Sequence, residues 1–238
     1  MPWERKYYKD GTAAISHRRK IVFVHVPKTG GTTIEKSDLF DDALAHHNIG
    51  GHMKLNNILR PEIESYTRFA VVREPCERFI SAFNYLKGGY GNLGDKHWWK
   101  ENGISDIDEF VQNKLKVVQY LHFKPQIPQL LLKDGRFGID VLLFTETMPQ
   151  DLLRLRNALG LNESKLWPEA LMSTRKNTHS HIPCSELNPS TRDAILAHYS
   201  YDSCVLGYKA DGPIPTQVSK ADYNERLNNL CLQLQPCR

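Results

Sequence analysis

The chain has 238 residues, of which 40% are hydrophobic and 24% charged, a composition typical of one globular domain that buries its own core. Its formal net charge is +4, without a long basic run, which suits an acidic ligand and argues against a nucleic acid polymer as partner. No apolar run approaches the roughly 20 residues that a membrane helix needs, and residues 1–20 lack the apolar core of a signal peptide.

The chain contains an odd number of cysteines. They are Cys76, Cys184, Cys204, Cys231 and Cys237. The absence of a CxxC pair argues against a structural zinc site, and the odd count argues against a full disulfide framework. Cys231 and Cys237 are near enough in the sequence to pair, and the redox compartment stays open.

Three short apolar segments, at 20–26, 67–72 and 139–146, have the β-branched composition of buried strands. Apolar residues at helical spacing predict helices between and after them. These run from 32 toward 40 and over 76–86, 107–115, 148–160, 188–199 and 219–235. Apolar strands that alternate with helices predict an α/β fold of three layers, with a central parallel sheet flanked by helices.

The segment HVPKTGG, residues 25–31, follows the first predicted strand. In parallel sheets ligands bind beyond the carboxyl ends of the strands, and the free N–H groups at the start of a helix bind anions. Glycines let the backbone approach closely, while lysine and threonine supply charge and hydroxyl donors. We predict an anion site here; the alternative is a plain strand–helix turn. Its residues are Pro27, Lys28, Thr29, Gly30, Gly31, Thr32 and Thr33.

This segment does not match the phosphate loop of ATP- and GTP-binding proteins. That motif places lysine directly after a glycine, followed by a hydroxyl residue for magnesium. Here Lys28 precedes the glycines, and the dipeptide Gly-Lys occurs nowhere in the chain. A magnesium-dependent kinase is therefore a poor fit.

A second anion site is predicted in VVREPCERFISAF, residues 71–83. Arg73 stands at the end of the second strand, and Arg78 and Ser81 lie three residues apart on one face of the following helix. Arginine binds phosphate through a planar fork of donors, to which a serine hydroxyl adds another. The alternative is that Arg73 forms ordinary surface ion pairs with its glutamate neighbours.

Together the two segments resemble the motifs of sulfotransferases that use 3′-phosphoadenosine 5′-phosphosulfate (PAPS). They are most similar to the Golgi-type carbohydrate sulfotransferases, particularly the heparan sulfate 2-O-sulfotransferase group. In that family the first motif holds the 5′-phosphosulfate, and the second, R-x-P-x-x-R-x-x-S, holds the 3′-phosphate. The fixed positions of the second motif are Arg73, Pro75, Arg78 and Ser81 here.

The resemblance covers about residues 20–208 and implies a P-loop-like fold in one sulfotransferase domain, 1–238. The N-terminal extension 1–19 and the C-terminal helix 218–235 are expected to be peripheral. PAPS is the implied donor and 3′-phosphoadenosine 5′-phosphate (PAP) the product, with no metal required. The implied acceptor is a hydroxyl or amine of a carbohydrate or small hydroxylated molecule.

The expected cellular compartment depends on whether the sequence contains a membrane-spanning segment, and none is found. We expect a cytoplasmic protein. The Golgi lumen is the alternative if a membrane anchor has been removed, because animal members of the family are anchored Golgi enzymes. The oligomeric state stays open.

Two catalytic roles are predicted. Sulfuryl transfer depends mainly on positioning and electrostatics, so Lys28 is expected to stabilise the bridging oxygen as it leaves. The acceptor must lose a proton, and histidine suits a base near neutral pH. His52 is favoured over His46 and His47, because GGHMKL resembles the surroundings of a histidine in the 2-O-sulfotransferase group. Glu35 is a further candidate, although it lies within a helix; exposed loop histidines are the plain alternative.

Other candidate ligand contacts lie in loops. The acceptor-binding candidates are His47, His122, Lys124 and Gln126. The candidates for closing over the nucleotide are Arg175 and Lys176. Trp98 and Trp99 either stack on a sugar ring or hold a loop in place. No metal site is expected, because no pair of histidines has metal-binding spacing on a helix.

Two other functions stay open. A nucleotide kinase or other phosphotransferase on the same fold would need magnesium and ATP. A protein that has lost catalysis would bind PAP and transfer nothing.

Overall fold

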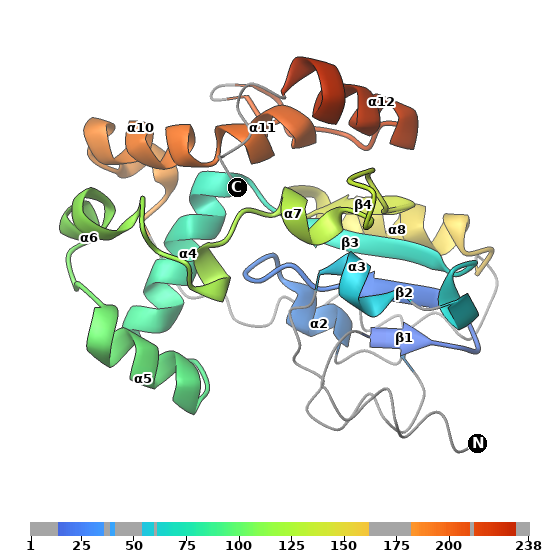
Figure 1. The fold of residues 1–238 in the computed structure, drawn as a ribbon, viewed down its shortest axis with the longest axis horizontal. Coiled ribbons are helices and arrows are strands. Elements are labelled where there is room, and N and C mark those ends of the chain that lie inside the picture. Colours follow the sequence, from blue (N-terminus) through green and yellow to red (C-terminus); the bar gives the residue numbers. More distant parts are fainter. Residues whose placement is uncertain are drawn as a thin grey trace.

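The computed structural model describes residues 14–35, 39–40, 54–59, 61–161, 182–209 and 212–231. Its centre is a four-stranded sheet in the order β1-β2-β3-β4 (Figure 1). The strands are β1 Ala14–Ser16, β2 Ile21–Val24, β3 Thr67–Val72 and β4 Val141–Phe144. β2, β3 and β4 are parallel, as predicted, and β1 pairs antiparallel with β2.

β1 lies within the stretch that the sequence places in a peripheral extension. It joins the sheet through the pairs Ala14 with Phe23 and Ser16 with Ile21. Three residues are too few to show the alternation by which strands are predicted. Part of the expected N-terminal extension therefore belongs to the sheet.

The parallel strands are buried on both faces, which explains their continuous apolar sequences. Val22 and Val24 point into one hydrophobic cluster and Ile21 and Phe23 into another, and all four are fully buried. Each cluster lies between the sheet and a layer of helices. The fold is thus the predicted three-layer α/β arrangement.

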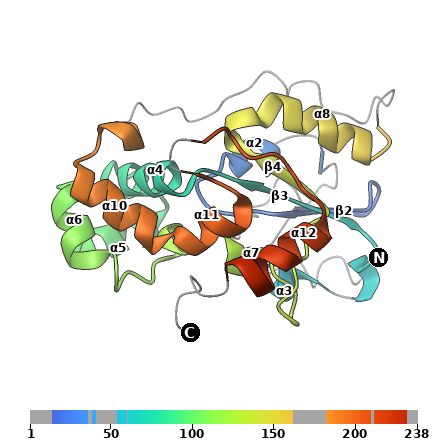
Figure 2. The ribbon, with the colours of Figure 1, turned by 90° about the horizontal axis from the view of Figure 1, so that it is seen from above.

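Figure 2 shows the two helical layers on opposite sides of the sheet. One layer contains α2 Gly31–Glu35 and α8 Met148–Ala158. The other contains α3 Leu55–Ile58, α7 Ile127–Leu130, α11 Ser200–Leu206 and α12 Lys220–Glu225. Single turns complete the described elements: η1 Pro61–Ile63, η2 Leu121–Phe123, η3 Thr145–Thr147, η4 Cys184–Glu186 and the π-helical η5 Arg226–Leu230.

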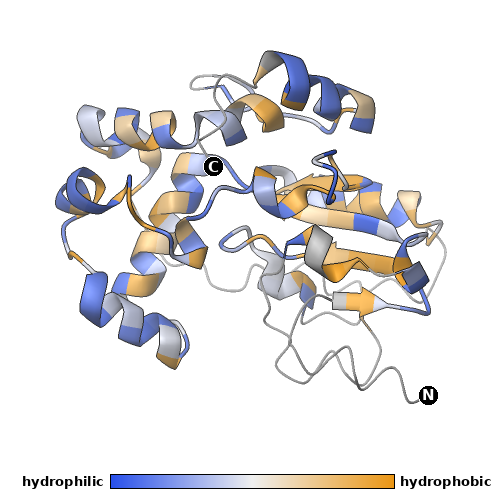
Figure 3. Cartoon of the chain, viewed as in Figure 1, coloured by the Kyte–Doolittle hydropathy of each residue, from blue (hydrophilic) through white to orange (hydrophobic). Residues whose placement is uncertain are grey.

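A helical lobe adjoins the sheet and has a third hydrophobic cluster. It contains α4 Pro75–Lys87, α5 Leu93–Asn102, α6 Ile107–Lys114 and α10 Pro189–His198. In Figure 3 these helices carry both apolar and polar faces, whereas the central strands are mostly apolar. α5 is not predicted from the sequence. Its Trp98 stacks on Tyr120 with the ring centroids 4.2 Å apart, and Trp99 meets Phe83 edge-on, so both tryptophans help to pack the lobe.

The C-terminal helix is integral to the core. Tyr223 of α12 and Leu227 of η5 are buried in the cluster on one face of the sheet. Asn224 also accepts a hydrogen bond of 2.9 Å from the backbone N–H of Phe137. This segment, expected to be peripheral, therefore covers the sheet.

Two disulfides join distant parts of the chain: Cys76 with Cys184, and Cys204 with Cys231. The pairing of Cys231 with Cys237, which the sequence leaves open, does not form, because η5 packs against α11 and brings Cys231 to Cys204. Within the described ranges, no helix has the length and apolar character to cross a membrane.

Candidate active site

The first predicted motif forms a tight loop between β2 and α2. Lys28 and Gly30 both adopt left-handed backbone conformations, with φ of 69° and 84°. A Cβ at Gly31 would lie 2.4 Å from His25 Cδ2 and 2.9 Å from Phe23 Cζ. These contacts explain the second glycine, since any side chain there would collide with buried rings.

Hydrogen bonds hold this loop to the ends of two neighbouring strands. The Thr29 hydroxyl donates to the Val26 carbonyl at 2.9 Å, so that hydroxyl is used within the loop. The Thr145 hydroxyl lies 2.8 Å from the carbonyl oxygen of Thr29 and 3.0 Å from that of Val72. The loop therefore keeps a fixed position relative to β3 and β4.

The side chains of His25 and Glu35 form a pair next to the loop. The Nδ1 atom of His25 lies 2.8 Å from Oε1 of Glu35, and both side chains are largely buried. This pairing joins the residue after β2 to the last residue of α2 across the loop. It leaves Glu35 poorly suited to act as a general base.

Lys28 places its ammonium group in the space between the loop and α4. Its Nζ lies 3.5 Å from the centroid of the Tyr85 ring, a favourable cation–π distance. Burial and, second, the positive charge of Arg73 lower the pKa of Lys28 to about 8, although the charge of Asp95 opposes both effects. Lys28 is thus a partly desolvated cation within electrostatic reach of a second cation.

The second motif begins where β3 ends. Gln126 clamps the Arg73 backbone: its Oε1 accepts from the Arg73 N–H at 3.1 Å, and its Nε2 donates to the Arg73 carbonyl at 2.8 Å. Nη2 of Arg73 lies 3.5 Å from Oε2 of Glu77. Burial lowers the pKa of Arg73, against the opposing charges of Glu77, Glu146 and Glu74.

Ser81 lies on α4 between the residue that contacts Arg73 and the residue that contacts Lys28. It follows Glu77 by one turn of α4 and precedes Tyr85 by one turn, so the three share one face of the helix. Glu77 contacts Arg73, and Tyr85 contacts Lys28. Lys28, Arg73 and Ser81 therefore face one region beside the ends of β2 and β3.

Arg78 takes a different position from Arg73. It is fully buried, and its guanidinium donates to the carbonyls of His122 at 3.1 Å and Lys124 at 2.7 Å. The sequence predicts Arg78 as a cofactor contact, whereas the structure uses its donors to hold the 122–124 turn. The helix turns it toward the lobe because it lies one residue after Glu77.

Two predicted acceptor contacts are likewise buried. His122 places Nε2 3.1 Å from Oδ1 of Asp95, and the Tyr120 hydroxyl donates to the same oxygen at 2.5 Å. Burial raises the pKa of Asp95, but the bonds from His122 and Tyr120 bring it down to about 2. Gln126 is fully buried at the Arg73 backbone, whereas Lys124 is exposed.

Several predicted residues lie outside the described ranges. They are the favoured base His52, its alternatives His46 and His47, and the nucleotide-closing candidates Arg175 and Lys176.

Tyr85 and Asp95 are site residues that the sequence prediction misses. Tyr85 follows Ser81 by four residues, so helical spacing alone places it on the motif's face. Asp95 closes the capping box of α5 with Asn92, a local pattern that gives no indication of its contacts with His122 and Tyr120.

A possible metal cluster adjoins the second motif. Ligand atoms of Glu74, Cys76 and Cys184 lie within 4.8 Å of one another. Because the two sulfurs are bonded to each other, neither is the thiolate that binds a metal. The cluster is therefore assigned to the disulfide.

Lys28 and Arg73 thus lie beside the ends of two adjacent parallel strands, the edge of an α/β sheet at which ligands bind in such folds. A family model described as "Sulfotransferase family" matches residues 12–209, and the chain belongs to that family. Its members carry out sulfuryl transfer on a P-loop-like fold. Searches of curated proteins and of solved structures gave no match.

Proposed function

We propose that this protein transfers a sulfuryl group from PAPS to a hydroxyl or amine of a carbohydrate or small hydroxylated acceptor. The convergence of Lys28 and Arg73 carries the proposal. Two positive charges repel each other more strongly where they are partly desolvated, and an anion bound between them offsets this repulsion. PAPS carries phosphate groups at both ends of its ribose, which suits two cations from separate strands.

Each motif is proposed to hold one end of the donor. The loop from Pro27 to Thr33 would surround the 5′-phosphosulfate, and Arg73 with Ser81 would bind the 3′-phosphate. Arg78 is proposed as a positioning residue instead, since Nη1 and Nη2 of its guanidinium already hold the turn beside Gln126, which clamps Arg73.

Transfer would proceed in line. The bond from sulfur to the bridging oxygen breaks as the acceptor oxygen or nitrogen bonds to sulfur, and negative charge develops on the bridging oxygen. Lys28 would stabilise that charge, which is why no metal is required in this proposal. The acceptor proton would pass to a histidine, for which His52 stays our first choice.

The acceptor side is proposed on narrower grounds. Likeness to the heparan sulfate 2-O-sulfotransferase group depends on the two motifs and favours a carbohydrate acceptor. Among the described acceptor candidates, Lys124 is exposed and keeps that role. His122 and Gln126 are buried, so we propose that they position Asp95 and Arg73.

We propose an oxidising compartment, such as the Golgi lumen, in place of the cytoplasm. Two disulfides lie in the described part of the chain. Structural disulfides persist in oxidising compartments and are rare in the cytosol.

An acceptor screen with PAPS labelled in its sulfuryl group tests the function. We expect label in at least one carbohydrate or small hydroxylated acceptor, and its loss in Lys28→Ala. Turnover of ATP with magnesium would favour the phosphotransferase alternative. Strong thermal stabilisation by PAP without transfer to any acceptor would favour a protein that binds the nucleotide only.

A further inference from the structure

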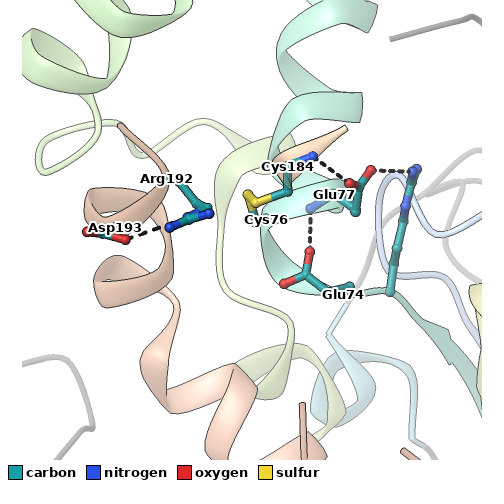
Figure 4. Close-up of a disulfide and its surroundings, with 7 residues drawn as sticks. Glu74, Cys76, Glu77, Cys184, Arg192 and Asp193 are labelled. Atoms are coloured by element: carbon teal, nitrogen blue, oxygen red, sulfur yellow. Dashed lines mark hydrogen bonds and ion pairs between the residues drawn. A yellow bond between two sulfur atoms is a disulfide. The ribbon is translucent and has the colours of Figure 1, made fainter. Parts of the chain in front are cut away.

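Glu77 uses its two carboxylate oxygens differently. Oε1 accepts a hydrogen bond of 2.7 Å from the backbone N–H of Cys184. Oε2 lies 3.5 Å from Nη2 of Arg73, longer than the ~2.7–2.9 Å of a charge-assisted hydrogen bond. Glu77 is therefore anchored at Cys184 and held at the edge of contact with Arg73. Figure 4 shows its carboxylate directed at Cys184.

The disulfide fixes the position of that anchor. Cys184 is bonded to Cys76, which directly precedes Glu77 and is fully buried. The two cysteines are 108 residues apart in the chain. A covalent link between them keeps the N–H of Cys184 beside the first turn of α4.

The other carboxylates whose charge acts on Arg73 are also held by donors. Glu146 accepts from the Glu74 N–H at 2.7 Å and from the Tyr208 hydroxyl at 3.0 Å. Glu74 accepts from the Glu77 N–H at 2.6 Å. These donors lie between β3 and α4, in α4 and in the segment after α11. The anchor of Glu77 differs, because its donor, the N–H of Cys184, belongs to a distant segment of the chain that the disulfide ties to α4.

We propose that the Cys76–Cys184 disulfide is a positioning element of the donor site: it anchors Glu77 so that its carboxylate does not close on Arg73. The inference rests on the proposed binding of the 3′-phosphate by Arg73. If the disulfide opened, the anchor would move and the ion pair would tighten in a partly buried place where charges interact strongly. A phosphate would then have to displace Glu77.

Calorimetric titration with PAP and with adenosine 5′-phosphate tests this, since the two nucleotides differ only in the 3′-phosphate. Cys76→Ala/Cys184→Ala should weaken PAP binding about tenfold, the effect of one charge-assisted hydrogen bond. Binding of adenosine 5′-phosphate should change by less than about twofold. The matched control, Cys204→Ala/Cys231→Ala, should bind PAP as the parent protein does.

Glu77→Gln identifies the carboxylate as the cause. Added to Cys76→Ala/Cys184→Ala, it should restore most of the lost PAP affinity. In the disulfide-bonded protein it should strengthen PAP binding about threefold, because a weak competing ion pair is removed. Weaker PAP binding by Glu77→Gln would overturn the proposal, as would equal loss of both nucleotides without the disulfide.

Folding and function are controlled separately. Circular dichroism checks that the variant without the Cys76–Cys184 bond is folded; if it is not, Glu77→Gln in the oxidised protein decides alone. If the parent protein shows no preference for PAP over adenosine 5′-phosphate, the proposed function itself fails. A preference for PAP that none of these substitutions alters would refute only the role of the disulfide.

Discussion

At the scale of single residues, the placement of Lys28 lowers the stability of the protein when no donor is bound. The backbone of Lys28 is left-handed, its ammonium is partly buried, and Arg73 is near. The Tyr85 ring and Asp95 offset part of this cost. Such placement is typical of a group kept for binding at the expense of stability.

Lys28→Met should therefore stabilise the donor-free protein by about 1–2 kcal/mol at pH 7. The lowered pKa of Lys28 means that the unfolded chain binds more protons between pH 8 and 10.5. The penalty is thus full below pH 8 and fades toward pH 10.5. Urea denaturation at pH 7 and pH 10 measures it, with the exposed Lys96→Met as control. Destabilisation at pH 7 would contradict this account.

The same pKa predicts how PAP binding depends on pH. Affinity should be level between about pH 7, above the second pKa of the phosphates, and pH 8, and fall at higher pH as Lys28 loses its proton, by up to about tenfold per pH unit. Lys28→Arg, whose guanidinium stays charged, should keep a constant PAP affinity up to about pH 9.5. Calorimetry over this range measures both proteins. If PAP affinity of the parent protein depended on pH as little as that of Lys28→Arg, Lys28 would not be the residue that binds the anion.

At the scale of elements, the turn between η2 and α7 supports the donor site. Arg78 holds its first half through two carbonyls. Buried Asp202 holds the second half by accepting from the N–H groups of Gln126 at 2.6 Å and Ile127 at 3.0 Å. Gln126 in turn clamps Arg73, so α4 and α11 act on the strand end through this turn.

Arg78→Lys should cost about 3 kcal/mol of stability, because one ammonium cannot replace the buried guanidinium beside Asp202. PAP affinity should fall less than in Arg73→Ala. Urea denaturation and PAP titration measure the two effects, with half-exposed Arg192→Lys as control. Unchanged stability with strongly reduced PAP affinity would show instead that Arg78 contacts the phosphate.

At the scale of the whole molecule, two disulfides connect the layers. Cys76–Cys184 ties the start of α4 to the segment before α10, and Cys204–Cys231 ties α11 to the end of η5. Cross-links stabilise mainly by restricting the unfolded chain, and long loops gain most.

Cys204→Ala/Cys231→Ala should lower the free energy of unfolding by about 3 kcal/mol, from a loop with a sequence separation of 27. Dithiothreitol should lower the thermal midpoint of the parent protein further, since it opens both bonds. The variant without all four of these cysteines is the control and should not respond to the reductant. A parent midpoint that the reductant leaves unchanged would contradict a stabilising role for the disulfides.

The sequence by itself determined the features that local patterns encode. The three parallel strands, the major helices and the two basic motifs follow from short-range periodicity, turn chemistry and residue spacing, and they were sufficient to indicate the sulfotransferase family. The three-residue β1 gave too little pattern, and α5 lacks a clear apolar face.

The tertiary structure alone decided which polar residues face inward and which cysteines pair. Arg78, His122 and Gln126 look like ligand contacts in the sequence, but they are buried against partners 44, 27 and 53 positions away, respectively. Cys231 bonds to Cys204 rather than to its neighbour in the sequence. These outcomes depend on long-range packing, which spacing along the chain does not specify, because a buried polar group goes where the folded chain supplies its hydrogen-bond partner.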